Sequence, residues 1–184
     1  NEFVNAIYFF KKSIKQKKNY DSYIGLGWCY FKIGFSKESI EAFYKALELQ
    51  EVWDSYLGLG SAFLESKQNR KAIYFFQKSL ELKENPNSYQ GMGTAYINQR
   101  KYNEAIISFK KALALREEWV SYQGLGWALV KNQQYEKSIP MFKKSVEMNK
   151  DWNSYRGIGY AYFKLSIFKE AIKAFKLSIG LMEY

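Results

Sequence analysis

Paired glycines recur along this sequence, and closely spaced glycines can place backbone amides around a phosphate group. They lie in the hexapeptide Ser-Tyr-x-Gly-(Leu/Met/Ile)-Gly, which occupies residues 22–27, 55–60, 88–93, 121–126 and 154–159. A phosphate-binding loop needs its glycines after a strand, followed by a third glycine or by a Lys-Ser/Thr pair. Here Gly27 continues into the sequence Trp28-Cys29-Tyr30, which we assign to a helix. The sequence therefore does not predict nucleotide binding.

Side chains suited to catalysis or metal binding are scarce. There is no histidine, which removes the commonest general base and metal ligand, and Cys29 is the only cysteine. Because Cys29 lies in an aromatic run, we expect a small buried apolar residue and not a reactive thiol. Carboxylates such as Glu38, Glu41 and Glu48 are scattered over predicted helix surfaces, and their spacing forces no pair into a cleft. We expect no catalytic residue, no cofactor and no metal site, and therefore no enzyme within these residues.

The hexapeptide copies are separated by 33 residues each time, which indicates one structural unit repeated along the chain. Within a unit, apolar residues such as Tyr23, Leu26 and Tyr30 follow the spacing of one helix face. The pattern breaks at Gly34 and resumes at Ile40 with the same spacing, which predicts a second helix. Each unit is therefore expected to be a pair of helices.

The expected boundaries follow from the period. They are a leading half-repeat at 1–19, which matches the second helix alone, and full repeats at 20–52, 53–85, 86–118, 119–151 and 152–184. Ten of the twelve glycines lie in the hexapeptides and only two prolines occur, so no linker divides the chain and we expect one domain. Each pair can cover its apolar stripe only against its neighbours, which predicts a solenoid of eleven helices.

The residues of one unit resemble a known repeat. Tyr89, Met92-Gly93, Tyr96, Ala105, Phe109 and Ala112 match the tetratricopeptide repeat pattern, and the match covers essentially the whole chain. The resemblance implies an all-α, right-handed superhelical solenoid of antiparallel helix pairs. Two departures are a tyrosine in place of the usual tryptophan in every copy and a period of 33 instead of 34. The missing residue falls between repeats, so we expect a tighter turn there and a different superhelical pitch.

The resemblance also implies that the first helices line a concave surface that binds a peptide or partner protein. We predict a partner-binding face made of Trp28, Ser61, Thr94, Trp127 and Tyr160, with Gln90, Gln123 and Arg156 beside them and Lys131 and Lys164 one turn further on. The alternative for both tryptophans is that they fill space between adjacent first helices. Chaperone-binding members grip a terminal carboxylate with Lys, Asn and Arg on this face, but Arg156 is the only cation at the matching places, so we do not expect that clamp.

The first glycine of each hexapeptide points away from the expected packing stripe, whereas the second lies on it. The first glycines are Gly25, Gly58, Gly91, Gly124 and Gly157. Each costs about 1 kcal/mol against alanine in a helix interior. We expect them to leave an open floor on the concave face beside the tryptophans; the alternative is simple inheritance through duplication of the repeat.

Other functions remain open. The net charge is +10, with lysines recurring on the second helices, which is compatible with a basic surface that binds nucleic acid or another polyanion. Only four of the 28 basic residues are arginine, which argues against specific phosphate recognition.

The array is alternatively a recruitment or spacer region of a larger enzyme, such as a glycosyl- or sulfotransferase. Because the ends lack a polar cap, we expect a fragment of a longer, cytoplasmic protein that self-associates through its ends.

Overall fold

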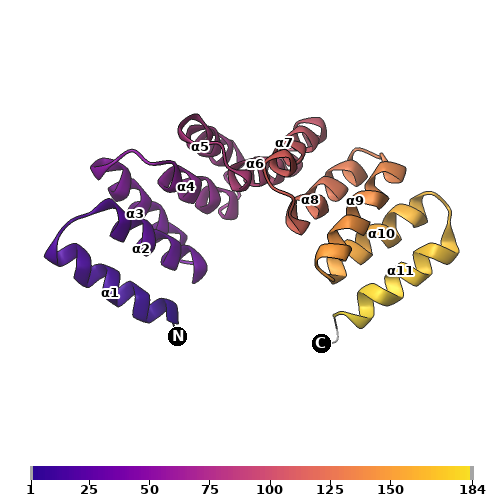
Figure 1. Cartoon of the computed structure of the whole chain (residues 1–184), viewed down its shortest axis with the longest axis horizontal. Helices are drawn as coiled ribbons and strands as arrows, with labels where there is room; N and C mark the ends of the chain where they lie inside the picture. The colour runs from indigo at the N-terminus through magenta and orange to yellow at the C-terminus, as the bar shows by residue number, and fades with distance from the viewer. Residues whose placement is uncertain (1, 183–184) are drawn as a thin grey trace. The chain divides into compact units, whose positions relative to one another are not determined.

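The computed structural model describes residues 2–182, and this range contains eleven α-helices and no strand (Figure 1). The chain divides into two compact units, residues 1–95 and residues 96–184. The all-helical hairpin architecture predicted from the 33-residue period is confirmed.

The first unit begins with α1 (Glu2–Gln16), which packs on α2 (Tyr20–Lys32). The next hairpins are α2 with α3 (Ser36–Leu49), and α4 (Trp53–Glu65) with α5 (Asn69–Leu82). The first helices α2 and α4 also lie against one another. Helix α6 (Pro86–Asn98) begins in this unit and ends in the next.

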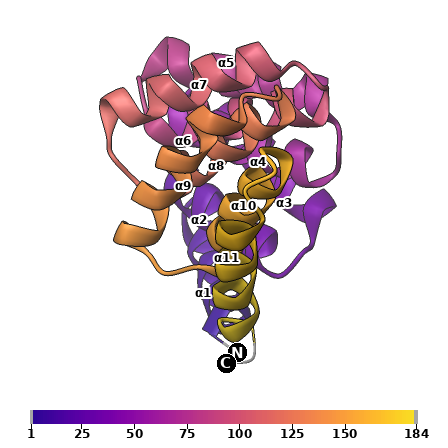
Figure 2. The same cartoon turned by 90° about the vertical axis from the view of Figure 1, so that its right-hand side faces the viewer.

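The second unit contains α7 (Tyr102–Leu115), α8 (Trp119–Lys131), α9 (Tyr135–Met148), α10 (Trp152–Lys164) and α11 (Phe168–Gly180). Each helix packs on the next one along the chain, and the first helices α8 and α10 also touch. The succession of α9, α10 and α11 is visible in Figure 2. Both units therefore repeat the same local arrangement of hairpins.

Each hairpin turn contains one residue in the left-handed backbone region. Gly34 has φ 81°, and the equivalent residues Lys67, Arg100, Gln133 and Ser166 have φ between 58° and 62°. A left-handed residue after the last helical turn lets the following amides bond back to that turn, which ends the helix. The turn geometry is therefore the same with or without glycine.

The turns between hairpins are short, with three residues between α3 and α4 and the same number in the later turns. In three of these turns the tyrosine hydroxyl of the hexapeptide bonds to a glutamate of the turn. Tyr56 donates to Glu51 Oε1 at 2.7 Å and Tyr122 donates to Glu117 Oε1 at 2.7 Å. Burial, together with Glu51, raises the pKa of Tyr56 to about 12. Tyrosine in place of tryptophan thus ties the turn to the helix, whereas the altered pitch stays a prediction.

In the repeats of Phe43, Phe76 and Phe142, a phenylalanine from the second helix fills the space between two first helices. Phe43 of α3 is 0% exposed, and a β-carbon at Gly27 of its own hairpin would lie 2.8 Å from the ring. A β-carbon at Gly58 of the next hairpin would overlap the same ring from the other side. Phe76 lies in the same way between Gly60 and Gly91, and Phe142 between Gly126 and Gly157. We call this arrangement the phenylalanine plug.

The open floor predicted for the first glycines is wrong. A β-carbon at Gly25, Gly58, Gly91, Gly124 or Gly157 would overlap the phenylalanine of the preceding second helix. The error arose because a helix inside a solenoid packs on two sides, and a residue outside one apolar stripe can belong to the second. The expectation that the second glycines lie on the packing side of the first helix is confirmed at Gly27, Gly60, Gly126 and Gly159.

Pairs of buried serines join consecutive hairpins. The hydroxyl oxygens of Ser79 and Ser88 lie 3.0 Å apart, as do those of Ser145 and Ser154. Ala46 takes the place of the first serine in one repeat, and there the buried hydroxyl of Ser55 has no hydrogen-bond partner. An unsatisfied buried hydroxyl costs about 1–3 kcal/mol. The unpaired hydroxyl of Ser55 therefore lowers the free energy of unfolding.

Apolar side chains are exposed at both terminal helices. Helix α1 has no buried residue, and its Tyr8 and Phe9 are 62% and 65% exposed. Phe168, Ile172 and Ile179 of α11 are also exposed. Self-association through these helices stays a prediction. Cys29 is buried as expected, and burial raises the pKa of its thiol.

Replacing Gly58 with alanine tests the phenylalanine plug. We expect Gly58→Ala to lower the free energy of unfolding by about 1–3 kcal/mol, because the new methyl group displaces a fully buried ring. An open floor would instead give a gain of about 1 kcal/mol from helix propensity. Urea unfolding, monitored by circular dichroism, shows whether the free energy of unfolding falls or rises. Gly180→Ala, where a β-carbon meets nothing within 4 Å, is the control without a ring to displace, and it should leave stability unchanged or raise it by up to about 1 kcal/mol.

One substitution should have opposite effects at two equivalent serines. Ser55→Ala removes an unsatisfied hydroxyl and should raise the free energy of unfolding by about 1 kcal/mol. Ser154→Ala breaks a buried hydroxyl pair and should lower it by about 1 kcal/mol. Both serines occupy the third position of a first helix, so helix propensity cancels in the comparison. Equal effects at the two positions would contradict this account of the hydroxyl pairs.

Candidate binding site

A hollow of about 440 Å³ lies on the first-helix side of the second unit. Its lining combines the end of α8, the following turn, the start of α9 and the middle of α10. The lining residues are Trp127, Val130, Lys131, Gln133, Tyr135, Arg156 and Tyr160. Four of the predicted partner-binding residues, Trp127, Lys131, Arg156 and Tyr160, are therefore brought together here.

Trp127 is held in place by the phenylalanine plug beneath it. Its ring meets Phe142 edge-to-face, with ring centroids 5.3 Å apart and an angle of 73° between the planes. Because Phe142 is fully buried between two glycines, its ring has no space to move when its surface neighbours change. Trp127 is itself half-buried and lines the hollow, whereas its role in partner binding stays a prediction.

Arg156 is exposed and lies over two aromatic rings. Its guanidinium carbon is 5.1 Å from the ring centroid of Trp127 and 5.0 Å from that of Trp152. It also donates a 2.7 Å hydrogen bond to Asn153 Oδ1. These contacts fix the guanidinium plane at the edge of the hollow without using an acidic partner. Since Lys131 is the other charged lining residue, the hollow is positively charged.

The indole N–H of Trp127 is buried and makes no hydrogen bond within the described residues. The equivalent indole of Trp28 in the first unit donates to Asp54 Oδ1 at 3.3 Å. Asn153 stands where Asp54 stands in that earlier repeat, and its oxygen accepts from Arg156 instead. Burial raises the pKa of Asp54, although the Trp28 hydrogen bond opposes this shift. Trp127 therefore offers an unused donor where Trp28 has a satisfied one.

The other predicted residues lie outside this hollow. Trp28, Ser61, Gln90 and Thr94 belong to the first unit. The hydroxyls of Ser61 and Thr94 bond back to backbone carbonyls of their own helices. Gln123 is held at the interface of α8 and α10, where its amide donates to Asp151 Oδ1 at 2.7 Å and to Ser154 Oγ at 3.1 Å.

Lys164 lies beside the hollow, with its ammonium group 5.5 Å from the ring centroid of Tyr160, which is part of the lining. Three lining residues were missed from the sequence: Val130, Gln133 and Tyr135. Gln133 and Tyr135 belong to the turn and the next helix, and a search along the first helix alone does not reach them. The aromatic residue directly after the turn was the available signal.

The hollow contains groups for binding: aromatic faces, two cations and an indole donor. Within residues 2–182, no group of three His, Cys, Asp or Glu side chains is placed to hold a metal ion. None of the helices in that range is long and apolar enough to cross a membrane.

Comparison with known proteins identifies the repeat. Models of the tetratricopeptide repeat match residues 20–52, 54–86, 86–119 and 124–181. The sequence has no match among curated proteins.

Solved structures share the fold. A chain of the APC/C hetero-tetramer Cut9-Hcn1 is 22% identical with a TM-score of 0.89, and the match covers 98% of this chain but only 37% of that one. MamA is 23% identical with a TM-score of 0.76, covering 86% and 95% of the two chains. YrrB, a TPR protein with an unusual peptide-binding site, is 19% identical with a TM-score of 0.73, covering 94% and 91%. With its 33-residue helical hairpins and these family matches, the chain belongs to the tetratricopeptide repeat family.

Proposed function

We propose that this chain is a non-catalytic protein-interaction scaffold that binds a peptide or a segment of a partner protein on its first-helix face. The observation that carries the proposal is the hollow in the second unit, where an unused indole donor and an exposed arginine lie side by side. The peptide-binding site named for YrrB, a protein of the same fold, supports a ligand of this class.

The lining suggests how a peptide would be held. The rings of Trp127, Tyr135 and Tyr160 offer apolar faces, which dominate the energy of many interfaces. The Trp127 indole, which is buried in the free chain, would donate to a backbone carbonyl once the ligand displaces the side chains that cover its N–H, and Arg156 would take a carboxylate. Phe142 already holds Trp127 in place, and Trp152 holds Arg156. Binding of a peptide therefore costs these side chains little conformational entropy.

A second candidate is a polyanion such as nucleic acid. The net charge of +10 and the positive lining favour it. Such binding depends on counterion release and falls steeply as salt rises, whereas a peptide held by aromatic faces is less sensitive. The recruitment or spacer role within a larger enzyme is a further proposal, which rests on the family resemblance alone.

Peptides selected from a random phage-displayed library on the whole chain test the proposal. We expect the selected sequences to combine an apolar residue with an acidic one. Arg156→Gln and Tyr160→Ala should each weaken binding of a selected peptide about tenfold or more. Fluorescence anisotropy with labelled peptide measures the change.

Lys32→Gln is the matched control, because Lys32 is the equivalent of Lys131 in the first unit and carries the same charge. It should leave peptide affinity unchanged. If Lys32→Gln weakens binding as much as Lys131→Gln, and the affinity collapses with added salt, the polyanion alternative replaces the peptide site.

The Trp127 indole provides a direct readout of ligand position. We expect its N–H signal in a proton–nitrogen NMR spectrum to shift on addition of a selected peptide, because the donor gains its first hydrogen bond. The indole signal of Trp28, already bonded to Asp54, should stay in place. Trp127→Phe identifies the signal by removing it. A peptide that binds without moving this signal does not occupy the hollow.

A further inference from the structure

A second hollow, of about 500 Å³, lies on the opposite face of α8, between α7 and α9. Its apolar lining consists of Ile106, Ile107, Leu125, Leu129 and Met141. Ile107 is 55% exposed, which leaves a large aliphatic side chain open to water. We call this hollow the outer groove.

The same helix builds both hollows in the second unit. Leu125 and Leu129 of α8 line the outer groove, whereas Trp127 and Lys131 line the hollow of the first-helix face. Residues two apart point in nearly opposite directions on a helix. The outer groove is thus separate from the site proposed above.

The charged side chains that line the outer groove are all positive. Lys110 of α7 and Lys137 of α9 contribute to its lining, and the lining contains no carboxylate. Its remaining polar groups are the neutral side chains of Asn103 and Gln134. An apolar floor between two cations complements an acidic segment that carries a bulky apolar side chain.

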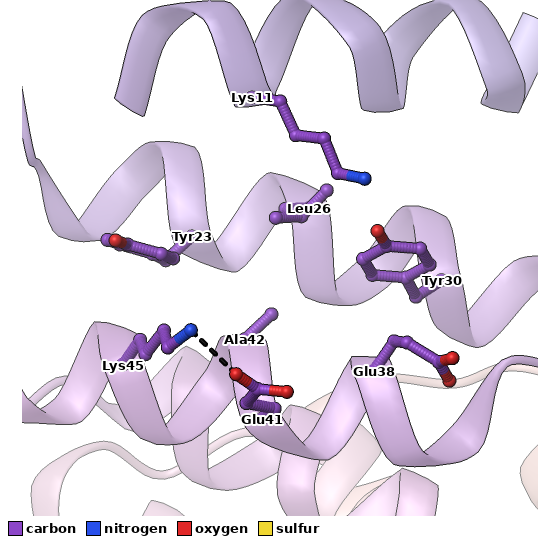
Figure 3. Close-up of a pocket in the computed structure, with 8 residues that line it drawn as sticks. All are labelled: Lys11, Tyr23, Leu26, Tyr30, Glu38, Glu41, Ala42 and Lys45. Atoms are coloured by element: carbon purple, nitrogen blue, oxygen red, sulfur yellow. Dashed lines mark hydrogen bonds and ion pairs between the residues drawn. The ribbon is translucent and has the colours of Figure 1, made fainter. Parts of the chain in front are cut away.

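The equivalent hollow in the first unit is smaller. Figure 3 shows this smaller hollow of about 160 Å³, between α1, α2 and α3. Tyr30 stands there in place of Leu129, with the ammonium group of Lys11 5.7 Å from its ring centroid.

Glu38 stands at the equivalent of Lys137, and the nearby Glu41 forms a 2.6 Å ion pair with Lys45. This copy therefore has a carboxylate, that of Glu38, where the outer groove has the cation of Lys137.

The groove between α3 and α5 is filled by aromatic rings. Phe75 stacks on Phe63 with ring centroids 5.3 Å apart, and it also meets Tyr44 and Tyr56. Phe63 and Phe75 occupy the positions that Leu129 and Met141 occupy in the outer groove. Replacement of two stacked rings by flexible aliphatic side chains leaves space at the outer groove that is packed in the earlier repeat.

We propose that the outer groove is a second docking site, for an acidic segment of a partner protein that inserts a bulky apolar side chain between α7 and α9. The inserted side chain covers Ile107 and rests on Leu125 and Leu129. Acidic residues on either side of it pair with Lys110 and Lys137. The array then holds partners on both faces of α8.

The test uses the whole chain and the blocked peptide acetyl-Asp-Glu-Leu-Phe-Glu-Asp-amide as the probe. We expect the methyl signals of Ile107 and Met141 to shift saturably in NMR titrations, while the Trp127 indole signal stays in place. Leu129→Tyr and Lys137→Glu copy residues of the first unit, and each should weaken binding about tenfold or more.

Lys143→Glu, an equal change of charge further along α9, is the matched control and should change affinity less than about twofold. Circular dichroism establishes that each variant is folded. The proposal is overturned if the methyl signals do not move at millimolar peptide, or if Leu129→Tyr leaves the affinity unchanged. Equal binding of a probe with serines in place of Leu-Phe also overturns it, because charge alone then accounts for the attraction.

Discussion

The phenylalanine plug is the contact on which the rest of this structure depends. One ring from a second helix, such as Phe43 or Phe142, occupies the space between a glycine of its own hairpin and a glycine of the next. A single side chain therefore joins three helices. Neither glycine can gain a β-carbon without moving a fully buried ring. The helix-propensity cost of these glycines is offset by close approach between hairpins, which no hairpin achieves alone.

The surroundings of Trp28 and Trp127 differ, although both tryptophans pack on equivalent plug rings. Trp28 and Trp127 each stand edge-on against a plug ring, at 5.2 Å and 5.3 Å. What differs is one neighbouring side chain: Asp54 satisfies the first indole, whereas Asn153 turns to Arg156 and leaves the second indole unbonded. A small polar change between two copies of the repeat thus decides whether the indole donor is satisfied or left unused.

Much of the fold could be predicted from the sequence. The 33-residue period and the helical spacing of apolar residues predict eleven helices, and the repeated tyrosine and glycine positions indicate the family. The site was predicted less well. Trp127, Lys131, Arg156 and Tyr160 meet as expected, but Gln123 is occupied in holding α8 to α10. Tyr135 enters the hollow from the next helix, which a face-by-face reading of the first helix does not include.

By itself, the sequence determined where helices begin and end and which residues share a helix face, because both follow from local spacing. Only the tertiary structure decided which neighbour each face meets. A first helix inside a solenoid packs on both its own second helix and the preceding one, so Gly58 is buried although it lies off the main apolar stripe. Whether a groove is filled, as by Phe75, or left open, as beside Leu129, depends on side chains from three helices at once. The spacing of apolar residues along one helix does not say whether side chains of the neighbouring helices fill the space beside it.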